Sequence, residues 1–411
     1  MKILIVNEKD IKGGSARAAF RLHKALLKIG IDSQMLVQSK FSNDPRIIGP
    51  LNKFQKGIAI LRPELDKLPL KLYTNWDRTP FSTGWLPFSG IVDKINESNA
   101  DIVHLHWIFN GMLRIEEMAK IQKPIVWTLH DMGAFTGGCL YDNNCGKYLR
   151  GCKYCPVLGS NKKNDLSKRI FYRKIKIYKK IDNIYLVGLS KWMVNSAKNS
   201  KLLGSCPIVN LPNPIDTDIF KPLDKNTARD ILNIPLNKKF VLFGASNPYD
   251  NRKGFKELKK AINKVNSSEV ELMVFGSSSP TKNHNFKFKT HYKGKLDDDI
   301  SLCVLYSASD VTVVPSLQEN LSNVIMESLS CGTPVVAFNI GGNGDMVEHM
   351  ENGYLAKPFD SSDLALGIDY VLVNSVKNSF SKRARIKVLD RFDMELVAKK
   401  YKSLYDEILN I

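Results

Sequence analysis

The sequence predicts an α/β protein with two doubly wound domains, each built around a parallel sheet. Short apolar runs typical of buried strands alternate with amphipathic stretches typical of helices over most of the chain. At 411 residues the chain is long enough for two or three domains that each have a core. Pro212 and Pro214 interrupt any regular element between Asn210 and Asp216. We therefore expect a first domain over residues 1–208 and a second over residues 209–391.

The first domain opens with a strand over Ile3–Val6, the pair Gly13-Gly14 and a helix over Ser15–Ile29. The helix is expected because apolar side chains recur on one of its faces, and Gly30 ends it. Further strands are expected at Ser33–Val37, Ile102–His106, Ile125–Leu129 and Ile184–Gly188.

The second domain repeats this pattern, with a strand over Phe240–Gly244 and a helix over Gly254–Val265. Because strands alternate with helices throughout, both sheets are predicted to be parallel. Its later elements are expected at Val270–Phe275, Ile300–Ser309 (a helix), Val311–Val314 and Pro334–Phe338.

Glu319 and Glu327 stand eight residues apart between the last two of these strands. The pattern predicts a short loop and then a helix ended by Gly332, with Glu319 at the helix mouth and Glu327 about two turns inside. At 1.5 Å of rise per residue the carboxylates would lie roughly 10–12 Å apart, about the span of a diphosphate-linked sugar from hexose to ribose. The N–H groups of residues 320–323 would then face the diphosphate. A capped surface helix with two solvated acids is the simpler alternative.

This stretch, with Gly341-Gly342 after the second strand, resembles the E-x7-E motif of the retaining glycosyltransferases of family 4, which have the GT-B fold. The segment Asn210–Asp216 is similar to the family's P-N-x-x-D linker, with Pro214 where the family more often has glycine. The resemblance covers nearly the whole chain and is more specific in its second half. It implies two Rossmann-like domains that face a central cleft. The first would bind the acceptor and the second the nucleotide sugar, with a C-terminal helix over residues 392–411 crossing back onto the first.

The resemblance also implies roles around the donor. Lys253 matches a lysine that neutralises the leaving diphosphate, whereas Ser246 stands near the place where relatives carry an arginine, so Arg252 is expected to supply the second charge. A basic helix start without a ligand is disfavoured, because cations at a helix N-terminus oppose the helix dipole. Glu319 would hold the sugar and Glu327 the ribose. The other donor contacts are expected from Gly13, Gly14, Ser246, Gly276, Asn320, Leu321 and Ser322.

His130 follows the strand Ile125–Leu129, at the carboxyl edge where ligands gather in open parallel sheets. By the resemblance it contacts the donor sugar and the reacting centre. His104 and His106 end the preceding strand and are placed to line the acceptor side. A histidine at a strand end is more often structural, and we expect a function for His130 but not for His104.

The implied reaction moves a sugar from a nucleoside diphosphate to an acceptor hydroxyl with retention at the anomeric carbon. Negative charge develops on the departing phosphate, so Lys253, Arg252 and the N–H groups of residues 320–323 are expected to provide most of the catalysis. No clear carboxylate is present for a covalent glycosyl-enzyme, and front-side displacement is expected. No metal is required for this. The run Asp297–Asp299 looks like a metal-binding D-x-D motif, but we interpret it as the start of a helix.

Four of the seven cysteines cluster at Cys139, Cys145, Cys152 and Cys155. Four thiolates can close a tetrahedral zinc site, and the C-x-x-C spacing of the second pair suits one, although the first pair's spacing is atypical. A structural zinc and four unligated thiols both stay open, whereas disulfides are not expected in a reducing cytoplasm. The run from His130 to Cys139 resembles a subgroup of bacterial capsular and exopolysaccharide glycosyltransferases. The resemblance implies that this loop walls the acceptor pocket.

The chain has a net charge of +19, which suits an anionic partner such as a nucleotide or a membrane surface. The densest basic run, Lys162–Lys180, also has apolar side chains at helical spacing. It predicts an amphipathic helix that either docks on an anionic membrane or packs on its own domain. No run approaches 18 apolar residues, and Met1–Asn7 is interpreted as a buried strand rather than a signal peptide. We expect a cytoplasmic protein, peripheral on the inner face of the cell membrane.

Two other classes of function stay open. The charge and the cysteine cluster would suit a zinc-bearing nucleic-acid-binding protein, although no recognition-helix or RNA-binding motif appears, and no nucleic-acid partner is expected. A GT-B-fold nucleotide-sugar epimerase would keep the fold and change the reaction. The sequence does not identify the base or the sugar of the donor, or the acceptor, because these are recognised by loop backbone and pocket shape rather than by a motif.

Overall fold

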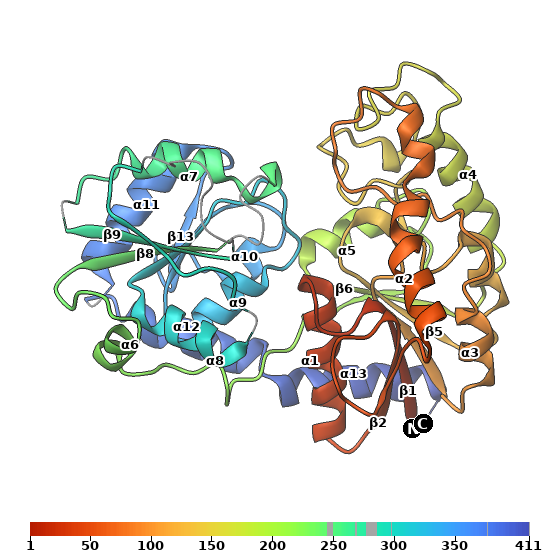
Figure 1. Cartoon of the computed structure of the whole chain (residues 1–411), viewed down its shortest axis with the longest axis horizontal. Helices are drawn as coiled ribbons and strands as arrows, with labels where there is room; N and C mark the ends of the chain where they lie inside the picture. Colours follow the sequence, from red (N-terminus) through yellow and green to blue (C-terminus); the bar gives the residue numbers. More distant parts are fainter. Residues whose placement is uncertain (245–249, 268, 277–285, 297, 376, 411) are drawn as a thin grey trace. The chain divides into compact units, whose positions relative to one another are not determined.

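The computed structural model describes residues 1–411 except 245–249, 268, 277–285, 297, 376 and 411 (Figure 1). The chain divides into two compact units, unit 1 with residues 1–214 and 397–411, and unit 2 with residues 215–396. The division falls directly after Pro214, inside the proline-rich segment, rather than at residue 208. Residues 392–396 lie with unit 2, and only residues 397–411 of the C-terminal segment belong to unit 1.

Unit 1 is built on a seven-stranded parallel sheet in the order β3-β2-β1-β4-β5-β6-β7. Its strands are β1 (Lys2–Lys9), β2 (Asp32–Ser39), β3 (Ile47–Ile48), β4 (Ile102–Leu105), β5 (Ile125–Leu129), β6 (Ile184–Gly188) and β7 (Ile208–Asn210). Its α-helices are α1 (Gly14–Lys28), α2 (Lys53–Asp66), α3 (Ile91–Glu97), α4 (Leu166–Tyr178), α5 (Lys191–Lys198) and α13 (Met394–Leu409), of which α13 begins in unit 2. Short 3-10 helices are η1 (Leu68–Leu72), η2 (Ile115–Lys120), η3 (Met132–Ala134) and η4 (Lys147–Leu149).

Unit 2 is built on a six-stranded parallel sheet in the order β10-β9-β8-β11-β12-β13. Its strands are β8 (Lys239–Gly244), β9 (Val270–Phe275), β10 (Thr290–Tyr292), β11 (Val311–Val314), β12 (Val335–Phe338) and β13 (Gly353–Ala356). Its helices are α6 (Lys225–Ile231), η5 (Asn251–Lys253), α7 (Phe255–Ile262), α8 (Asp299–Ala308), α9 (Asn323–Ser330), α10 (Asn343–Met346), α11 (Ser361–Asn374) and α12 (Phe380–Arg391).

Each sheet reverses its winding direction once. In unit 1 the chain goes from β1 outward to β2 and β3 and then returns to place β4 on the other side of β1. In unit 2 the same reversal lies between β8 and β11. The crevice at the carboxyl ends of strands next to such a switch point is where open α/β sheets bind ligands. The two sheets therefore predict one binding edge each, and the prediction of two doubly wound parallel-sheet domains is confirmed.

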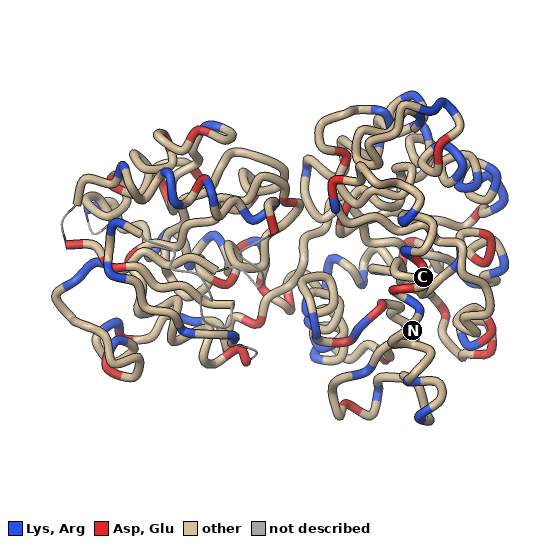
Figure 2. Tube along the Cα trace, turned by 45° about the horizontal axis from the view of Figure 1, so that its top comes forward, with Lys and Arg blue, Asp and Glu red and all other residues tan. Residues whose placement is uncertain are grey.

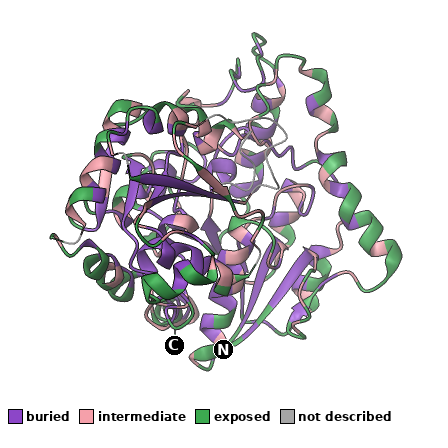
Figure 3. Cartoon of the chain, turned by 60° about the vertical axis from the view of Figure 1, so that its left-hand side comes forward, coloured by how far each residue is buried: buried purple, intermediate pink, exposed green. Residues whose placement is uncertain are grey.

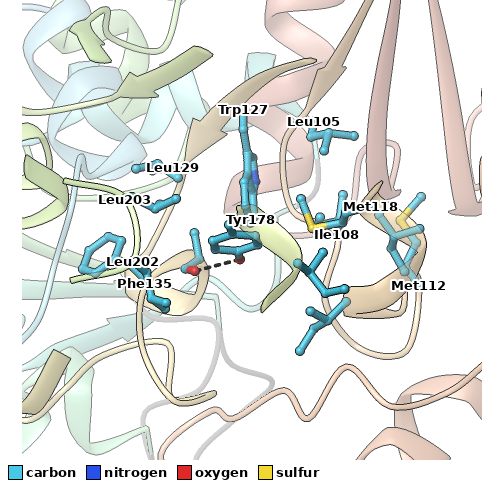
Figure 4. Close-up of a cluster of buried hydrophobic side chains, with 14 of the residues drawn as sticks. Leu105, Ile108, Met112, Met118, Trp127, Leu129, Phe135, Tyr178, Leu202 and Leu203 are labelled. Atoms are coloured by element: carbon cyan, nitrogen blue, oxygen red, sulfur yellow. Dashed lines mark hydrogen bonds between the residues drawn. The ribbon is translucent and has the colours of Figure 1, made fainter. Parts of the chain in front are cut away.

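The strands carry the core of both units, as the purple strands in Figure 3 show. All five residues of β5 are buried, as expected for a parallel strand covered on both faces. In the unit 1 core Trp127 contacts the edge of the Tyr178 ring, with 6.1 Å between ring centroids. The Tyr178 hydroxyl donates to the Ala134 carbonyl at 2.9 Å, so its one polar atom is satisfied (Figure 4). No helix among the described residues is long and apolar enough to cross a membrane.

Candidate functional site

Loops of unit 2 meet at the carboxyl ends of β8, β11 and β12, which are neighbours in the sheet. The Leu317 amide donates to the Arg252 carbonyl at 2.7 Å, which joins the loop after β8 to the loop after β11. A side chain at Gly254 would overlap the carbonyl oxygen of Pro315, and one at Gly341 would overlap that of Glu319. Both glycines have positive φ angles, +67° and +51°. Glycine is therefore required at both positions, for backbone conformation and for close approach.

Lys253 and Glu319 lie together at this edge. The Lys253 Nζ is 3.0 Å from the Glu319 Oε2, although the residues are 66 positions apart in the chain. The two side chains are 34% and 13% exposed, so the pair is partly accessible to a ligand. Arg252, expected to supply a second cation, makes a bidentate contact with Asp250, at 2.7 Å from Nη2 and 3.1 Å from Nε. Part of its charge is thus already balanced within its own loop. Ser246 lies outside the described residues.

The helix that carries Glu327 begins later than the sequence predicts. Ser322 is the N-cap of α9, with its hydroxyl accepting from the Ile325 amide at 3.5 Å, so Glu319 lies in the loop before the helix and not at its mouth. Glu327 is inside the helix as expected and is 3% exposed. Its Oε2 accepts a hydrogen bond from the Tyr306 hydroxyl at 3.0 Å. Tyr306 therefore holds the carboxylate of Glu327 in a defined position.

The remaining described donor positions of unit 2 lie in this loop and after β9. Asn320, Leu321 and Ser322 are buried, at 2%, 7% and 4% exposure. Gly276 follows β9 with φ +97°, and its amide donates to the Gly294 carbonyl at 2.7 Å. The loop backbone around the site is thus packed and ordered by its own contacts.

The acidic run before α8 is a helix start, as predicted. Asp298 is the N-cap of α8 and accepts from the Ser301 amide at 2.7 Å, while Asp299 is the first residue of the helix. Asp297 lies outside the described residues. The carboxylate of Asp298 is engaged by the helix, which explains this part of the D-x-D pattern without a metal.

In unit 1 the strand ends bring two histidines together. The His130 Nε2 lies 2.8 Å from the His106 Nδ1, with His106 after β4 and His130 after β5. Asp131 fixes this corner, because its carboxylate accepts from the Trp107 indole at 2.7 Å and from the Gly133 amide at 2.8 Å. From the sequence, His106 was expected to line the acceptor side, and its contact with His130 was not predicted. The contact between neighbouring strand ends adds His106 as its direct partner.

Burial keeps these rings neutral. Desolvation lowers the pKa of His130 to about 3 and that of His106 well below its ordinary value. The Nε2 of His106 is buried and has no hydrogen-bond partner among the residues that the structure describes. His104 uses both ring nitrogens in the core, toward Tyr405 and Thr128, each at 2.7 Å. His104 is therefore placed as a structural residue, while the His106–His130 pair reaches the strand ends.

The loop after β1 forms the other side of the unit 1 switch point. Gly13 has φ +107° and caps α1, and a side chain there would meet no atom within 4 Å. Its conformation, not crowding within the chain, calls for glycine, and Gly14 is the first residue of α1. Glu8, near the end of β1, is 4% exposed, and burial raises its pKa, with partial compensation by Lys9. Sequence analysis did not single out this carboxyl group.

The four clustered cysteines line one small cavity of about 10 Å³, together with residues that include Asp142 and Ser167. That volume is about what one water-sized particle requires. All four are free thiols, and burial raises the pKa of each, to about 12 for Cys152. Over the described part of the chain, no group of three or more His, Cys, Asp and Glu side chains is arranged to hold a metal ion. Structural zinc at Cys139, Cys145, Cys152 and Cys155 stays a prediction.

Comparison with protein families matches residues 224–387 to the model described as "Glycosyl transferases group 1". This range contains Lys253, Glu319 and Glu327. An uncharacterized glycosyltransferase of Methanocaldococcus jannaschii is 26% identical over 208 residues, which cover 48% of this chain and 53% of that protein. The chain thus spans about half the length of that relative.

Two further relatives come from Escherichia coli. "Putative colanic acid biosynthesis glycosyl transferase WcaC" is 24% identical over 82% of this chain and 83% of its own length. "UDP-Gal:alpha-D-GlcNAc-diphosphoundecaprenol alpha-1,3-galactosyltransferase" is 29% identical over 49% of this chain and 54% of its own length.

Solved structures share the fold over the whole chain. Sucrose-phosphate synthase from Thermosynechococcus elongatus superposes with a TM-score of 0.70 at 19% identity, covering 100% of this chain and 99% of that one. The HepE protein of Anabaena, solved with UDP and glucose, gives a TM-score of 0.64 at 17% identity, covering 99% and 100%. These GT-B glycosyltransferase neighbours confirm the predicted fold class.

Proposed function

We propose that this chain is a retaining glycosyltransferase. It would move a sugar from a nucleoside-diphosphate sugar to a hydroxyl of a glycan or lipid-linked saccharide, in bacterial surface polysaccharide synthesis. The observation that carries the proposal is the Lys253–Glu319 pair at the switch point of unit 2, inside the range that matches the group 1 family. The names of the Escherichia coli relatives support the acceptor class.

In the proposed mechanism unit 2 binds the donor. Lys253 faces the leaving diphosphate, where a preorganised cation stabilises the negative charge that develops as the sugar departs. Arg252 provides a second positive charge for the diphosphate once its contact with Asp250 loosens. Glu319 accepts hydrogen bonds from the sugar hydroxyls. Because Lys253 contacts Glu319, the two side chains would lie on either side of the bond between sugar and phosphate. The mechanism assigns charge neutralisation to these side chains and needs no metal.

Unit 1 supplies the acceptor side in this proposal. His130 contacts the donor sugar, and His106 holds its ring in one orientation through the 2.8 Å contact. Because burial keeps His130 neutral, it acts as a hydrogen-bonding group rather than as a cation.

Calorimetry on three variants tests the proposal. Glu327→Ala should weaken nucleoside-diphosphate binding about tenfold or more, because a hydrogen bond to a charged group contributes roughly 1.5–3 kcal/mol. Glu319→Ala should lower turnover and leave nucleotide affinity unchanged. Tyr306→Phe is the matched control, because it removes the partner of Glu327 but keeps the carboxylate, and it should retain most of the affinity.

A thermal-shift screen of nucleotide sugars would select the donor for these measurements. Unchanged nucleotide affinity in Glu327→Ala would remove the ribose assignment. Salt-sensitive DNA binding without any nucleotide binding would favour the nucleic-acid-binding alternative instead.

A further inference from the structure

The most apolar exposed surface of unit 1 lies in one short segment. Among the described residues, 28 large hydrophobic side chains are exposed, and eight of them fall between residues 51 and 72. This segment covers α2 and η1, and we call it the α2 surface. Its exposed side chains are Leu51, Phe54, Ile58, Ile60, Leu61, Leu65, Leu68 and Leu72. Such a concentration marks an interaction surface, because scattered exposed apolar residues are normal but contiguous ones are not.

Helix α2 is amphipathic with its apolar face outward. Phe54, Ile58, Leu61 and Leu65 follow the i, i+4, i+7, i+11 spacing of a single helix face, and Phe54 and Leu61 are 77% and 59% exposed. In a helix that serves only its own domain this face would be buried. Here it meets solvent over its full length.

The inward face of α2 is polar and firmly bound. Arg62 is buried and donates to the carbonyls of Gly111, Leu86 and Pro87, at 2.6, 3.3 and 3.1 Å. These bonds satisfy a buried guanidinium that would otherwise be costly. They also fix the rotation of the helix, so its apolar face cannot turn inward without breaking them.

Asp66 adds a second anchor at the end of α2. Its carboxylate is buried and accepts from the Ser82 hydroxyl at 2.9 Å and from the Thr83 and Gly84 amides at 3.1 and 3.0 Å. The outward apolar face is therefore a built feature of the fold rather than a helix that has detached from its domain.

The charges beside this face indicate the partner. Lys53, Lys56 and Lys71 are exposed within the α2 surface, where Glu64 is the only exposed acid and pairs with Lys67 at 2.8 Å. Basic helix α4 is close by, because the Gly84 amide binds Asp66 and the Gly84 carbonyl accepts from Arg173 of α4 at 2.8 Å. Figure 2 shows Lys and Arg gathered along α4 and the loops beside it. Apolar side chains flanked by cations match the interface of an anionic lipid bilayer.

Helix α4 alone does not meet this description. Its apolar side chains Ile170, Phe171 and Ile177 are buried in the core of unit 1, so the helix packs on its own domain. Lys174 is also buried and donates to the Gly133 and Thr136 carbonyls, while Arg173 pairs with Glu116 at 2.7 Å. Two of its cations thus hold the fold, and α4 contributes charge from its exposed residues but no apolar face.

We propose that the α2 surface docks unit 1 on an anionic membrane, with Phe54, Ile58, Leu61 and Leu65 entering the boundary between headgroups and acyl chains. The neighbouring lysines would contact lipid phosphates. This inference stands on the surface itself and goes beyond the proposed chemistry, although it would bring unit 1 to a lipid-linked acceptor.

Co-sedimentation of the full chain with vesicles tests the proposal. The wild type should bind vesicles of phosphatidylcholine mixed with phosphatidylglycerol, bind vesicles of phosphatidylcholine alone much less, and release as salt rises. The double variant Phe54→Ser/Leu61→Ser should lose about tenfold or more of its partitioning, because both side chains would forfeit their transfer from water. The matched control is Leu366→Ser/Val373→Ser on α11 of unit 2, at positions that are 60% and 72% exposed, and it should bind like the wild type.

Three results would overturn the proposal. One is equal binding of the wild type to both vesicle types, or to neither. Another is a double variant that partitions like the wild type. The third is a dimer in light scattering that the double variant abolishes without vesicles, which would assign the surface to a second copy of the chain. Nucleotide affinity, measured on the same samples, should be equal in all variants. If the wild type binds no nucleotide, the proposed glycosyl transfer is refuted, but the vesicle measurements still test membrane docking.

Discussion

Gly341→Ala is the sharpest perturbation of the proposed donor site. The new methyl group would overlap the Glu319 carbonyl, which belongs to a loop that the Lys253–Glu319 contact and the Arg252–Leu317 hydrogen bond hold in place. The backbone of Glu319 must therefore move, although the substitution changes neither a charge nor a proposed ligand.

The expected effect has two parts of different size. A non-glycine residue at φ +51° costs about 1–2 kcal/mol of stability through its backbone conformation alone. Moving Glu319 by about 1 Å should cost on the order of 100-fold in turnover, since misplacement of a positioning group has that effect. Gly30→Ala is the matched control: its φ is +82°, and a side chain there would meet nothing within 4 Å. It should lose only the conformational part of the stability and keep its turnover.

Steady-state release of nucleoside diphosphate from the donor, together with urea unfolding, measures both parts. We expect both variants to unfold at lower urea concentrations than the wild type, Gly341→Ala at the lower of the two because of its overlap with Glu319, and only Gly341→Ala to lose turnover. Equal turnover in both variants would show that the position of Glu319 does not control the reaction, and would refute this assignment of the site.

Three further outcomes are expected. If the cysteine cavity holds structural zinc, elemental analysis should find close to one zinc per chain, lost in Cys152→Ser and retained in Cys206→Ser; metal-free wild type with freely titrating thiols would reject the site. His106→Phe removes a partner of His130 Nε2 and should lower turnover about fivefold at unchanged nucleotide affinity, from the roughly 1 kcal/mol of a lost hydrogen bond; normal turnover would assign the pair to structure only. Burial lowers the pKa of His104 from 6.5 to about 3, so the unfolded chain binds protons that the folded chain does not, and stability should fall as pH drops from 6.5 to about 5; urea midpoints should fall less steeply for His104→Gln, and identical slopes would contradict the argument.

Buried strands were the most predictable elements. The bounds of β5, β6, β9 and β11 agree residue for residue with the predicted runs, because a strand covered on both faces is mostly apolar. Helix ends were less predictable, because they depend on single capping contacts. Ser322 caps α9, so the helix begins after Glu319 and not at it. Helix α2 was not expected, because Arg62 and Asp66, which hold its inner face, find their partners 16 to 49 residues away.

The sequence predicted which residues form the candidate site, but not which of their side chains contact one another. The motif located Lys253 and Glu319, and only the order of β8 and β11 in the sheet explains why they meet. The contact of Arg252 with Asp250 was missed because nothing in the spacing distinguishes an ion pair from a free cation. Likewise, the partnership of His106 with His130 arises between adjacent strand ends, where separation along the chain gives no signal.

The division of unit 1 into two pieces has a consequence for biosynthesis. Unit 2 interrupts unit 1, whose last piece is residues 397–411. Tyr405 in that piece is fully buried and binds His104 of the central strands. During translation residues 1–214 therefore lack this contact with His104 until unit 2 has been synthesised. Unit 2 is continuous in sequence and is synthesised before residues 397–411, so the segment that completes unit 1 follows the whole of unit 2.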